Sequence, residues 1–395
     1  MSSPGGGAIL CVNCGSSSVK VALLAADGAP RLAEAAVESI GSGAARGWAR
    51  APGGAAPLAR ELGSIEAATA VSVALDLLSE AAREAPVAVA HRVVHGGDRH
   101  LEATPIDDRV VADLESVTAL APLHQPAALA GIRVARARWP SLPQVACFDT
   151  AFHAGLPEVA RRFPLPASVT GPEVRRYGFH GLSYAHVMRI LGQPPPARLV
   201  IAHLGGGSSL VAVAAGRPVD TTMGLTPTGG VPMGTRTGDL DPGLLFYLAR
   251  RHGLSIDALE QLCDREAGLR GLGGTADMRA LLAAAPRDPA AALAIAVFAT
   301  GVRKAIGAYA AVLGGLDVLV FTGGVGAHAP AIRAAVCRDL AFLGVELDPA
   351  ANERGGPEIG TPGAGATRVL AMPADEEREM ARQTRARLAL SDPGR

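Results

Sequence analysis

Near the N-terminus, the pattern of hydrophobic and polar positions predicts two short strands joined by a polar turn. Ile9–Val12 is apolar throughout, and apolar residues alternate along Val19–Leu23. The glycine and serines at 15–18 separate the two segments, as is typical of a turn between strands. The alternation places Lys20 on the face of its strand opposite the valines.

A similar pattern returns about half a chain later. Leu199–Leu204 leads into a glycine/serine run at 205–209, and Leu210–Ala214 follows. Two strand–turn–strand units at this distance indicate a duplicated architecture. A chain of 395 residues is also too long for one ordinary core. We therefore expect two related α/β domains, with a boundary near Ala151.

A third glycine cluster has a different setting. Val318–Thr322 reads as a strand that enters a tight turn at Gly323–Gly326, and Pro330 opens a helical segment that runs to Leu340. A strand, a turn and a helix N-terminus present free N–H groups to an anion. The G-x-G-x-x-G spacing is missing, so the pattern does not specify a dinucleotide site.

Three further segments have simple interpretations. Residues 43–57 are rich in Gly, Ala and Pro and are expected to form a surface loop, as is Gly355–Gly365. The charged tail from Asp375 to Leu390 has the spacing of a helix.

Composition narrows the classes of partner. Hydrophobic residues make up 49% of the chain, charged residues 19%, and the formal net charge is zero, which suits a globular protein without a nucleic-acid partner. The apolar stretch Ala290–Leu313 is interrupted by Arg303 and Lys304, and no membrane span is expected. The first seven residues lack the features of a signal peptide, so we expect a cytoplasmic protein.

The five cysteines do not suggest a disulfide framework. Cys11 and Cys14 form a C-x-x-C, but a zinc ribbon needs a second pair and a thioredoxin-type pair opens a helix. A structural role is therefore favoured over a redox or metal role.

Lysine is confined to two positions, Lys20 and Lys304, among many arginines. An ammonium at the end of a Gly/Ser turn suits a phosphate group, because the turn supplies backbone N–H groups and hydroxyls. The alternative is a solvent-facing lysine on a polar turn.

Four polar residues stand in apolar or glycine-rich surroundings and are candidates for chemistry: Arg92, Asp149, His180 and Arg236. An arginine set among Gly and Thr can bear charge in phosphoryl transfer. The alternatives are a plain salt bridge for Arg92 and a core histidine for His180. Asp239 and Asp241 could hold a metal, but an Asp before Pro and an apolar helix is more simply an N-cap.

Seven sequence blocks together resemble the acetate kinase family. They are Asn13–Lys20, His91–Gly97, Leu120–His124, Phe148–His153, Gly178–Gly181, Met233–Pro242 and Phe321–Gly326. They follow the family's order and span nearly the whole chain. The family belongs to the superfamily of actin, the sugar kinases and the heat-shock chaperone ATPases.

The resemblance implies two duplicated ribonuclease-H-like domains with the nucleotide held between them. The first would comprise residues 1–150 completed by a helix at about 377–395, and the second residues 151–376. It further implies a homodimer and reversible transfer of the ATP γ-phosphoryl group to acetate, propionate or another short carboxylate.

Matched by position, Asn13 and Glu376 would organise Mg²⁺, for which Mn²⁺ can substitute. Arg92 and Arg236 would clamp the carboxylate and the transferring phosphoryl group, and His180 would stabilise its equatorial oxygens. Asp149 occupies the family's acid/base position. Since a carboxylate nucleophile is already ionised at neutral pH, we interpret Asp149 as an orienter of an arginine or of Mg²⁺.

The resemblance also assigns the remaining contacts. The acyl pocket would be lined by Val94, Leu123, Phe179 and Pro227. The nucleotide would be contacted by Lys20, by the second phosphate turn (His203, Leu204, Gly205, Gly206, Gly207), by a sugar and base segment (Asp277, Met278, Arg279) and by an adenosine turn (Gly324, Val325, Gly326, Ala327, His328).

The chain departs from the family pattern on the nucleotide side. Gly206 replaces the usual Asn, Ala327–His328 replaces Glu-Asn, Gly229 stands where an acidic residue is common, and Asp375 replaces an Asn. The residues of the transfer step match. We therefore expect a divergent acyl kinase that uses ATP, with GTP and pyrophosphate as the alternative donors to compare.

Two other functions are weighed against an acyl kinase. A sugar kinase of the same superfamily needs an aspartate base and a polar pocket, whereas this chain offers two arginines and an apolar pocket. A non-catalytic nucleotide-binding regulator or chaperone ATPase would lack transfer residues or carry an added domain, and Arg92, His180 and Arg236 are all present.

Overall fold

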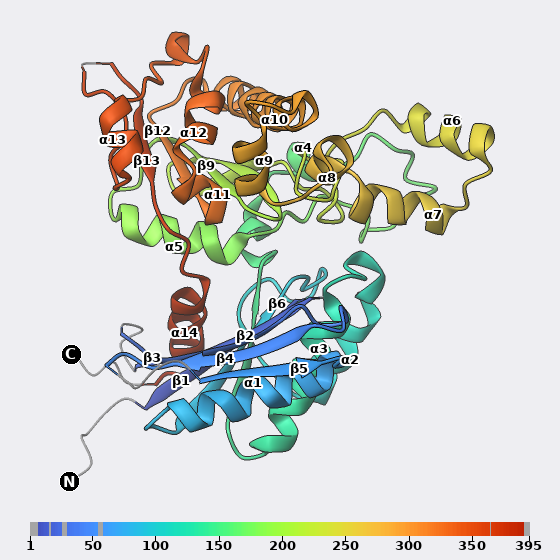
Figure 1. The fold of residues 1–395 in the computed structure, drawn as a ribbon, viewed down its shortest axis with the longest axis vertical. Coiled ribbons are helices and arrows are strands. Elements are labelled where there is room, and N and C mark those ends of the chain that lie inside the picture. Colours follow the sequence, from blue (N-terminus) through green and yellow to red (C-terminus); the bar gives the residue numbers. More distant parts are fainter. Residues whose placement is uncertain (1–6, 16, 26–29, 54–57, 364, 391–395) are drawn as a thin grey trace. The chain divides into compact units, whose positions relative to one another are not determined.

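The computed structural model describes residues 7–15, 17–25, 30–53, 58–363 and 365–390. Ser16 of the first polar turn and residues 1–6 of the segment tested for a signal peptide lie outside this range. The chain divides into two compact units, Met1–Phe152 with Asp375–Arg395, and His153–Ala374. Each unit contains one β-sheet with helices packed against it (Figure 1).

The sheet of the first unit has eight strands in the order β5-β4-β3-β2-β1-β6-β8-β7. Strands β1 to β3 are antiparallel neighbours, whereas β6 and β8 run parallel to β1. The strands are β1 Ala8–Cys14, β2 Ser18–Leu24, β3 Arg31–Glu38, β4 Ala45–Arg50, β5 Leu58–Gly63, β6 Pro86–Val93, β7 Thr104–Pro105 and β8 Gln144–Phe148. The two strands expected around the first polar turn are confirmed as β1 and β2.

Helices cover both faces of this sheet. The helices are α1 Ala67–Ala81, α2 Asp108–Ser116, the 3-10 turn Thr118–Leu120, α3 Gln125–Arg138 and α14 Glu376–Arg387. Apolar residues of α1 and α3 share one hydrophobic core with β1, β2 and β3. On β1 and β8 the thiols of Cys11 and Cys147 donate to backbone carbonyls of α14, at Glu377 and Met380.

The second unit repeats the core of the first. Its sheet has the order β11-β10-β9-β12-β13, with β9 to β11 antiparallel and with β12 and β13 parallel to β9. The same order and directions hold for β3-β2-β1-β6-β8, so the expected duplication is confirmed. The strands are β9 Arg198–Leu204, β10 Ser208–Ala214, β11 Arg217–Thr221, β12 Val318–Thr322 and β13 Arg368–Ala371.

Ten α-helices are described in the second unit. They are α4 Glu158–Arg161, α5 Gly181–Leu191, α6 Pro242–His252, α7 Ile256–Gln261, α8 Gly268–Gly273, α9 Met278–Ala284, α10 Pro289–Leu313, α11 Gly323–His328, α12 Pro330–Cys337 and α13 Pro349–Arg354. Short 3-10 turns cover Ala151–Gly155 and Ala341–Leu343, and a π-helical turn covers Leu262–Glu266.

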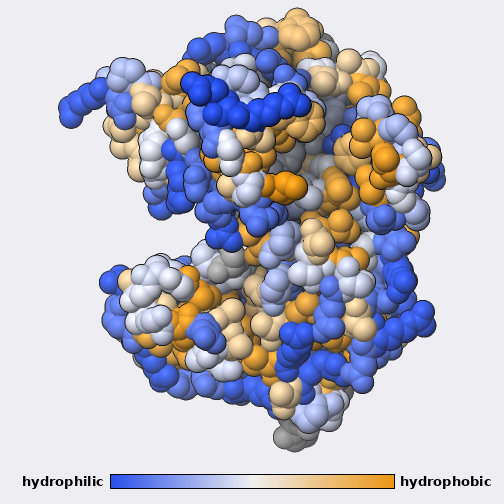
Figure 2. Space-filling model, turned by 90° about the vertical axis from the view of Figure 1, so that its right-hand side faces the viewer, coloured by the Kyte–Doolittle hydropathy of each residue, from blue (hydrophilic) through white to orange (hydrophobic). Residues whose placement is uncertain are grey.

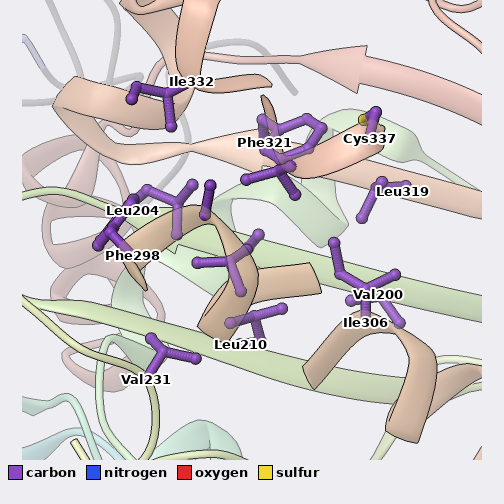
Figure 3. Packing of buried hydrophobic residues seen from close by; sticks show 14 of the residues in the cluster. Val200, Leu204, Leu210, Val231, Phe298, Ile306, Leu319, Phe321, Ile332 and Cys337 are labelled. Atoms are coloured by element: carbon purple, nitrogen blue, oxygen red, sulfur yellow. The ribbon is translucent and has the colours of Figure 1, made fainter. Parts of the chain in front are cut away.

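Helix α10 forms the centre of the second core. Within the described residues it is the single helix long and apolar enough to cross a membrane, and 33% of its most apolar window is buried. Its residues Ala294, Phe298, Val302 and Ile306 recur every four positions and are at most 1% exposed, as expected for one helical face on a core. Figure 3 shows Phe298 and Ile306 among side chains of β9, β10 and β12.

Two sequence-based expectations were wrong. Part of the expected loop at 43–57 is strand β4, because burial alternates along Ala45–Arg50 and the strand pairs with β3 and β5. The expected tight turn at Gly323–Gly326 is the first part of helix α11. The helical tail is confirmed as α14, and Asp241 is confirmed as an N-cap, since its side chain accepts a hydrogen bond from the Gly243 N–H.

Candidate functional site

In the first unit, the candidate residues gather where parallel strands end. Asn13 lies near the end of β1, Arg92 near the end of β6, and Asp149 directly after β8. Carboxyl ends of parallel strands meet at one edge of a sheet, where α/β proteins commonly bind ligands. Glu376 joins them as the first residue of α14. The fold thus collects four residues that are far apart in the sequence.

Arg92 is the centre of this cluster. Its Nη2 and Nε donate to Asp149 Oδ2 at 2.7 and 3.1 Å, and its Nη1 donates to Asn13 Oδ1 at 3.3 Å. Glu376 Oε2 lies 3.6 Å from Nε. Burial opposes the charge of Arg92, but Asp149 and Glu376 outweigh it and raise its pKa. The guanidinium therefore stays charged and is held in one orientation.

Lys20 lies beside this cluster on β2. It is the direct register partner of Asn13, and opposed residues of antiparallel strands point to the same face. The Lys20 side chain is exposed, as its position opposite Val19 and Val21 predicts. Of the expected acyl-pocket residues in this unit, Val94 is 8% exposed and Leu123 is half-buried.

The donor set around Arg92 suits a hard cation. Asp149 and Glu376 offer carboxylate oxygens and Asn13 an amide oxygen, and Mg²⁺ prefers one or two carboxylates completed by water and substrate phosphates. Among the described residues no group of three or more His, Cys, Asp or Glu side chains could hold a metal by itself. The chemistry fits a cation that is held jointly by the protein and by phosphate oxygens.

The start of α14 is fixed by an ionic network. Arg31 Nη1 lies 2.5 Å from Glu34 Oε2, and its Nη2 lies 3.6 Å from both Asp375 Oδ1 and Glu377 Oε2. Asp375 caps the helix by accepting from the Arg378 N–H. Burial, followed by the neighbouring charge of Glu376, raises the pKa of Glu377. Arg31 thus ties the segment that carries Glu376 to strand β3.

The C-x-x-C of β1 is buried on the same strand as Asn13. Cys11 and Cys14 are 0% and 6% exposed. Burial raises the pKa of the Cys14 thiol to about 12 and that of Cys11 well above its usual value. Protonated, buried thiols are poor nucleophiles and poor metal ligands, so the pair serves the packing of the strand.

In the second unit, two of the glycine-rich segments come into contact. The turn after β9 contains Gly205–Gly207, and α11 begins at Gly323 after the parallel strand β12. Gly323 has a φ of +75°, and a Cβ there would lie 2.6 Å from the Leu204 carbonyl oxygen. Only glycine allows this approach, which brings the expected phosphate turn and the start of the expected adenosine segment together.

His180 has an unusual backbone conformation at the start of α5. Its φ and ψ are 58° and 23°, in the left-handed region, where residues other than glycine are uncommon. Its Nδ1 lies 2.8 Å from Ser209 Oγ, and its ring stacks on that of His203, with centroids 4.2 Å apart. Strained residues cluster at functional sites, and this one is held from two sides.

Gly207 lies beside both His180 and Arg236. A Cβ at Gly207 would be 3.3 Å from His180 Nε2 and 3.5 Å from Arg236 Nη1. Arg236 Nη1 also donates to the Pro227 carbonyl at 3.3 Å. Phe179, which precedes His180, is 1% exposed. One imidazole, one guanidinium and one glycine turn therefore converge within this unit, next to two apolar residues.

The remaining nucleotide candidates have different surroundings. Asp277 caps α9 by accepting from the Arg279 N–H at 2.9 Å, while the Arg279 side chain is 92% exposed. Met278 is 5% exposed and belongs to the hydrophobic core, so its side chain faces away from solvent. Gly234 links this segment to the phosphate turn, since its N–H donates to the Gly206 carbonyl and its Cβ position is 3.3 Å from Ala276 Cβ.

Three residues of this region were missed by the sequence analysis. Ser209 and Tyr184 form a hydrogen bond to one another beside His180. The third is Arg333, 1% exposed, whose Nη1 donates to the carbonyls of Gly326 and Ala327 at 2.9 Å. Arg333 thereby fixes the end of α11. The sequence could have indicated Arg333, because an arginine stands in the apolar run of α12. No sequence feature pointed to Ser209 or Tyr184.

The comparisons with known proteins agree over nearly the whole chain. Residues 8–382 match the model of the acetokinase family. The chain is 44% identical to an acetate kinase of Clavibacter michiganensis over 96% of this chain and 99% of that protein. It is 45% identical to an acetate kinase of Deinococcus deserti over 96% and 98% of the two chains.

Solved structures give the same result. A propionate kinase from Francisella tularensis is 35% identical with a TM-score of 0.89, over 95% of this chain and 98% of that one. An acetate kinase from Porphyromonas gingivalis is 36% identical with a TM-score of 0.86, over 97% of this chain and 100% of that one.

Proposed function

The chain belongs to the acetokinase family, and from this premise we propose that it transfers the γ-phosphoryl group of ATP reversibly to a short carboxylate, giving an acyl phosphate and ADP. The observation that carries the proposal is a pair of arginines, each held by neighbours in its own unit. Arg92 donates hydrogen bonds to Asp149 and Asn13. Arg236 donates a hydrogen bond to the Pro227 carbonyl.

In this proposal Arg92 binds the acceptor. A guanidinium offers two parallel N–H donors to a carboxylate, and Asp149 keeps it in a fixed orientation. The acceptor is ionised at neutral pH, so its oxygen attacks phosphorus without a general base. Asp149 therefore acts as a positioning residue for Arg92.

Arg236 and His180 would bear the charge of the transfer. The phosphoryl group spreads negative charge over its equatorial oxygens as it moves, and preorganised donors stabilise that charge. His180 Nε2 and Arg236 Nη1 both lie beside the Gly207 position, which supports a shared role at one group. Lys20 and the turn His203–Gly207 would hold the nucleotide phosphates.

Asn13 and Glu376 would hold Mg²⁺, or Mn²⁺ in its place, together with phosphate oxygens. When bound, the ion supplies positive charge that neutralises the nucleotide phosphates. The amide oxygen of Asn13 and the carboxylate oxygens of Glu376, both beside Arg92, support this assignment.

The acyl pocket is proposed to consist of Val94, Leu123, Phe179 and Pro227. One methylene in an apolar pocket changes discrimination by only about 1–3 kcal/mol. We propose acetate as the acceptor, and kinetics with acetate, propionate and butyrate rank the acyl chains.

We further propose a homodimer that forms through the second unit. Within the described chain no residue of α6 is buried. Its large side chains Leu244, Phe246 and Tyr247 are 40%, 60% and 58% exposed. Figure 2 faces the side on which α6 lies in Figure 1 and shows orange hydrophobic residues at the surface. Exposed apolar side chains on a helix that packs against no hydrophobic core indicate an interface with another protein chain. Light scattering measures the molecular mass of the wild type and of Phe246→Asp in solution. A dimeric wild type and a monomeric variant would support α6 as the dimer interface, and an unchanged mass in the variant would contradict it.

We propose a cytoplasmic location because the cysteines form no disulfide bonds. All five are free thiols, and four of them are buried, which suits a reducing compartment. Fractionation of cells that express the full chain, with a cytoplasmic marker enzyme as control, tests the location.

The reaction is tested by trapping its product with hydroxylamine, which captures an acyl phosphate and leaves a sugar phosphate untouched. Purified protein is supplied with acetate and, in turn, ATP, GTP or pyrophosphate, with glucose as the matched control acceptor. We expect acetohydroxamate with ATP. Product with pyrophosphate alone would overturn the ATP assignment, and ADP release with glucose but not acetate would favour a sugar kinase.

A further inference from the structure

A chain of three hydrogen-bonding groups ends at His180. Ser209 Oγ lies 2.8 Å from His180 Nδ1 and also forms a hydrogen bond with the Tyr184 hydroxyl. Ser209 and Tyr184 are both 0% exposed. The sequence brings them together because Tyr184 lies one helical turn after His180 on α5, while Ser209 lies on β10 in the register position opposite His203.

The imidazole of His180 is therefore restrained on its face and on one edge. Its face stacks on His203 at an interplanar angle of 16°, and His203 Nδ1 is itself 2.9 Å from Ser183 Oγ of α5. Its Nδ1 edge meets Ser209. Its Nε2 atom lies 3.3 Å from the place where a Cβ at Gly207 would be. The Nε2 atom thus lies beside the space proposed for the phosphoryl group.

We propose that Tyr184 and Ser209 are positioning residues that hold His180 in the tautomer with its proton on Nε2. This inference rests on the proposed function of His180. A neutral imidazole carries one proton. If that proton is on Nε2, the ring donates to a phosphoryl oxygen. If it is on Nδ1, Nε2 presents a lone pair to the negative oxygens instead.

The chemistry of the three groups sets the direction of the chain. A phenol is a stronger acid than an aliphatic alcohol, with a pKa near 10, so Tyr184 donates to Ser209 Oγ. Ser209 has one proton, which then goes to His180 Nδ1. With Nδ1 acting as an acceptor, the ring proton is on Nε2. Second partners of this kind commonly fix which nitrogen of a functional histidine is protonated.

The test combines a spectroscopic and a kinetic measurement on the full chain. Protein labelled with ¹⁵N-histidine is compared as wild type, Tyr184→Phe and Ser209→Ala, and the His180 signals are identified by their loss in His180→Asn. Tyr184→Phe removes only a hydroxyl and keeps the ring, so the fold is expected to persist. Tyr309→Phe is the matched control, because Tyr309 is another buried phenol of the same unit, on α10, 5% exposed.

We expect the wild-type His180 to carry its proton on Nε2, and both variants to populate the Nδ1–H form. We expect kcat to fall about tenfold in Tyr184→Phe and up to about 100-fold in Ser209→Ala, with the KM values for ATP and acetate changed less than about twofold. Tyr309→Phe should alter neither the spectrum nor kcat.

The two levels of the proposal fail differently. An active wild type whose His180 is protonated on Nδ1, or whose tautomer and kcat are unaffected by Tyr184→Phe and Ser209→Ala, overturns this inference and leaves the acyl kinase in place. A wild type that makes no acyl phosphate overturns the proposed function, and the spectrum still reports whether the tautomer is fixed.

Discussion

Arg92 donates two hydrogen bonds to one oxygen of Asp149, from Nη2 at 2.7 Å and from Nε at 3.1 Å. The carboxylate is 1% exposed, whereas the guanidinium side chain is 20% exposed. The acid is thus the buried member of the pair and the arginine is the member that can reach a ligand. A sequence-based choice between a salt bridge and a ligand contact for Arg92 is therefore unnecessary, since the same side chain can make both.

Arg92→Ala is expected to lower kcat/KM by about 10³-fold or more and the free energy of unfolding by about 3 kcal/mol, because the buried Asp149 carboxylate loses the guanidinium that compensates its charge. Arg92→Lys keeps a charge but loses the planar fork, so it should recover stability more than activity. Acyl phosphate kinetics and urea unfolding measure the two effects separately.

A double variant, Arg92→Ala with Asp149→Asn, serves as the control. It should regain stability relative to Arg92→Ala without regaining turnover. Arg236→Ala should lower turnover by a similar factor, because its Nη1 lies beside the Gly207 position proposed for the phosphoryl group. Near-normal turnover in both Arg92→Ala and Arg236→Ala would contradict the assigned roles.

Gly207→Ala is expected to reduce kcat by about 100-fold with little effect on stability. The added methyl would lie 3.3 Å from His180 Nε2 and 3.5 Å from Arg236 Nη1, in the space proposed for the phosphoryl group. Gly307→Ala, on α10 of the same unit, is the matched control, because nothing lies within 4 Å of its Cβ position. Steady-state kinetics should show a much lower kcat for Gly207→Ala than for the control. Equal kcat values would contradict the proposed position of the phosphoryl group beside Gly207.

His153 should make the second unit less stable in mild acid. Burial, opposed by its hydrogen bond to the Phe179 carbonyl, lowers its pKa to about 4, below the ordinary value of 6.5. The unfolded chain then binds a proton that the folded chain does not, so this stability is complete above pH 6.5 and is lost as the pH falls toward 4. The loss amounts to roughly 3 kcal/mol.

Urea unfolding midpoints at pH 7.5, 6.0 and 5.0 measure this dependence. His153→Gln should reduce it but leave the part due to His91, whose pKa burial also lowers to about 4. His252→Gln, at the exposed end of α6, controls for the loss of an imidazole. A wild-type midpoint that does not change from pH 7.5 to 5.0 would argue against a neutral buried His153.

Arg31→Ala is expected to loosen the start of α14. Arg31 connects Glu34 of β3 with Asp375 and Glu377, and partly exposed pairs of this kind contribute up to about 1 kcal/mol. Faster hydrogen exchange in the first turn of α14 and a severalfold weaker Mg²⁺ affinity, by calorimetry with ADP present, should follow. Arg46→Ala removes the exposed Arg46–Glu61 pair of the same sheet and should change neither. Unchanged exchange in Arg31→Ala would show that α14 is held by other contacts.

Several elements were predictable because their signal is local. Alternation identified β1 and β2, the repeated strand–turn–strand pattern indicated the duplicated sheets, and helical spacing identified α14. Where local composition and pairing disagreed, pairing prevailed: β4 lies in a Gly- and Ala-rich segment, yet it is a strand because β3 and β5 satisfy its backbone. Similarly, Gly323–Gly326 continues into helix α11 because contact with Leu204 fixes its first residue.

Residue types and their order are enough to identify the family, the duplicated α/β architecture and the charged groups. Tertiary structure alone decided how each group is presented. Lys20 was the residue that the composition singled out, but its position follows from pairing with Asn13, and Asn13 in turn bonds to Arg92. Likewise, Ser209 of β10 lies beside His180 and Tyr184 only because the fold brings these distant segments together. Hydrogen bonds between distant segments depend on the folded geometry, and no local pattern encodes them.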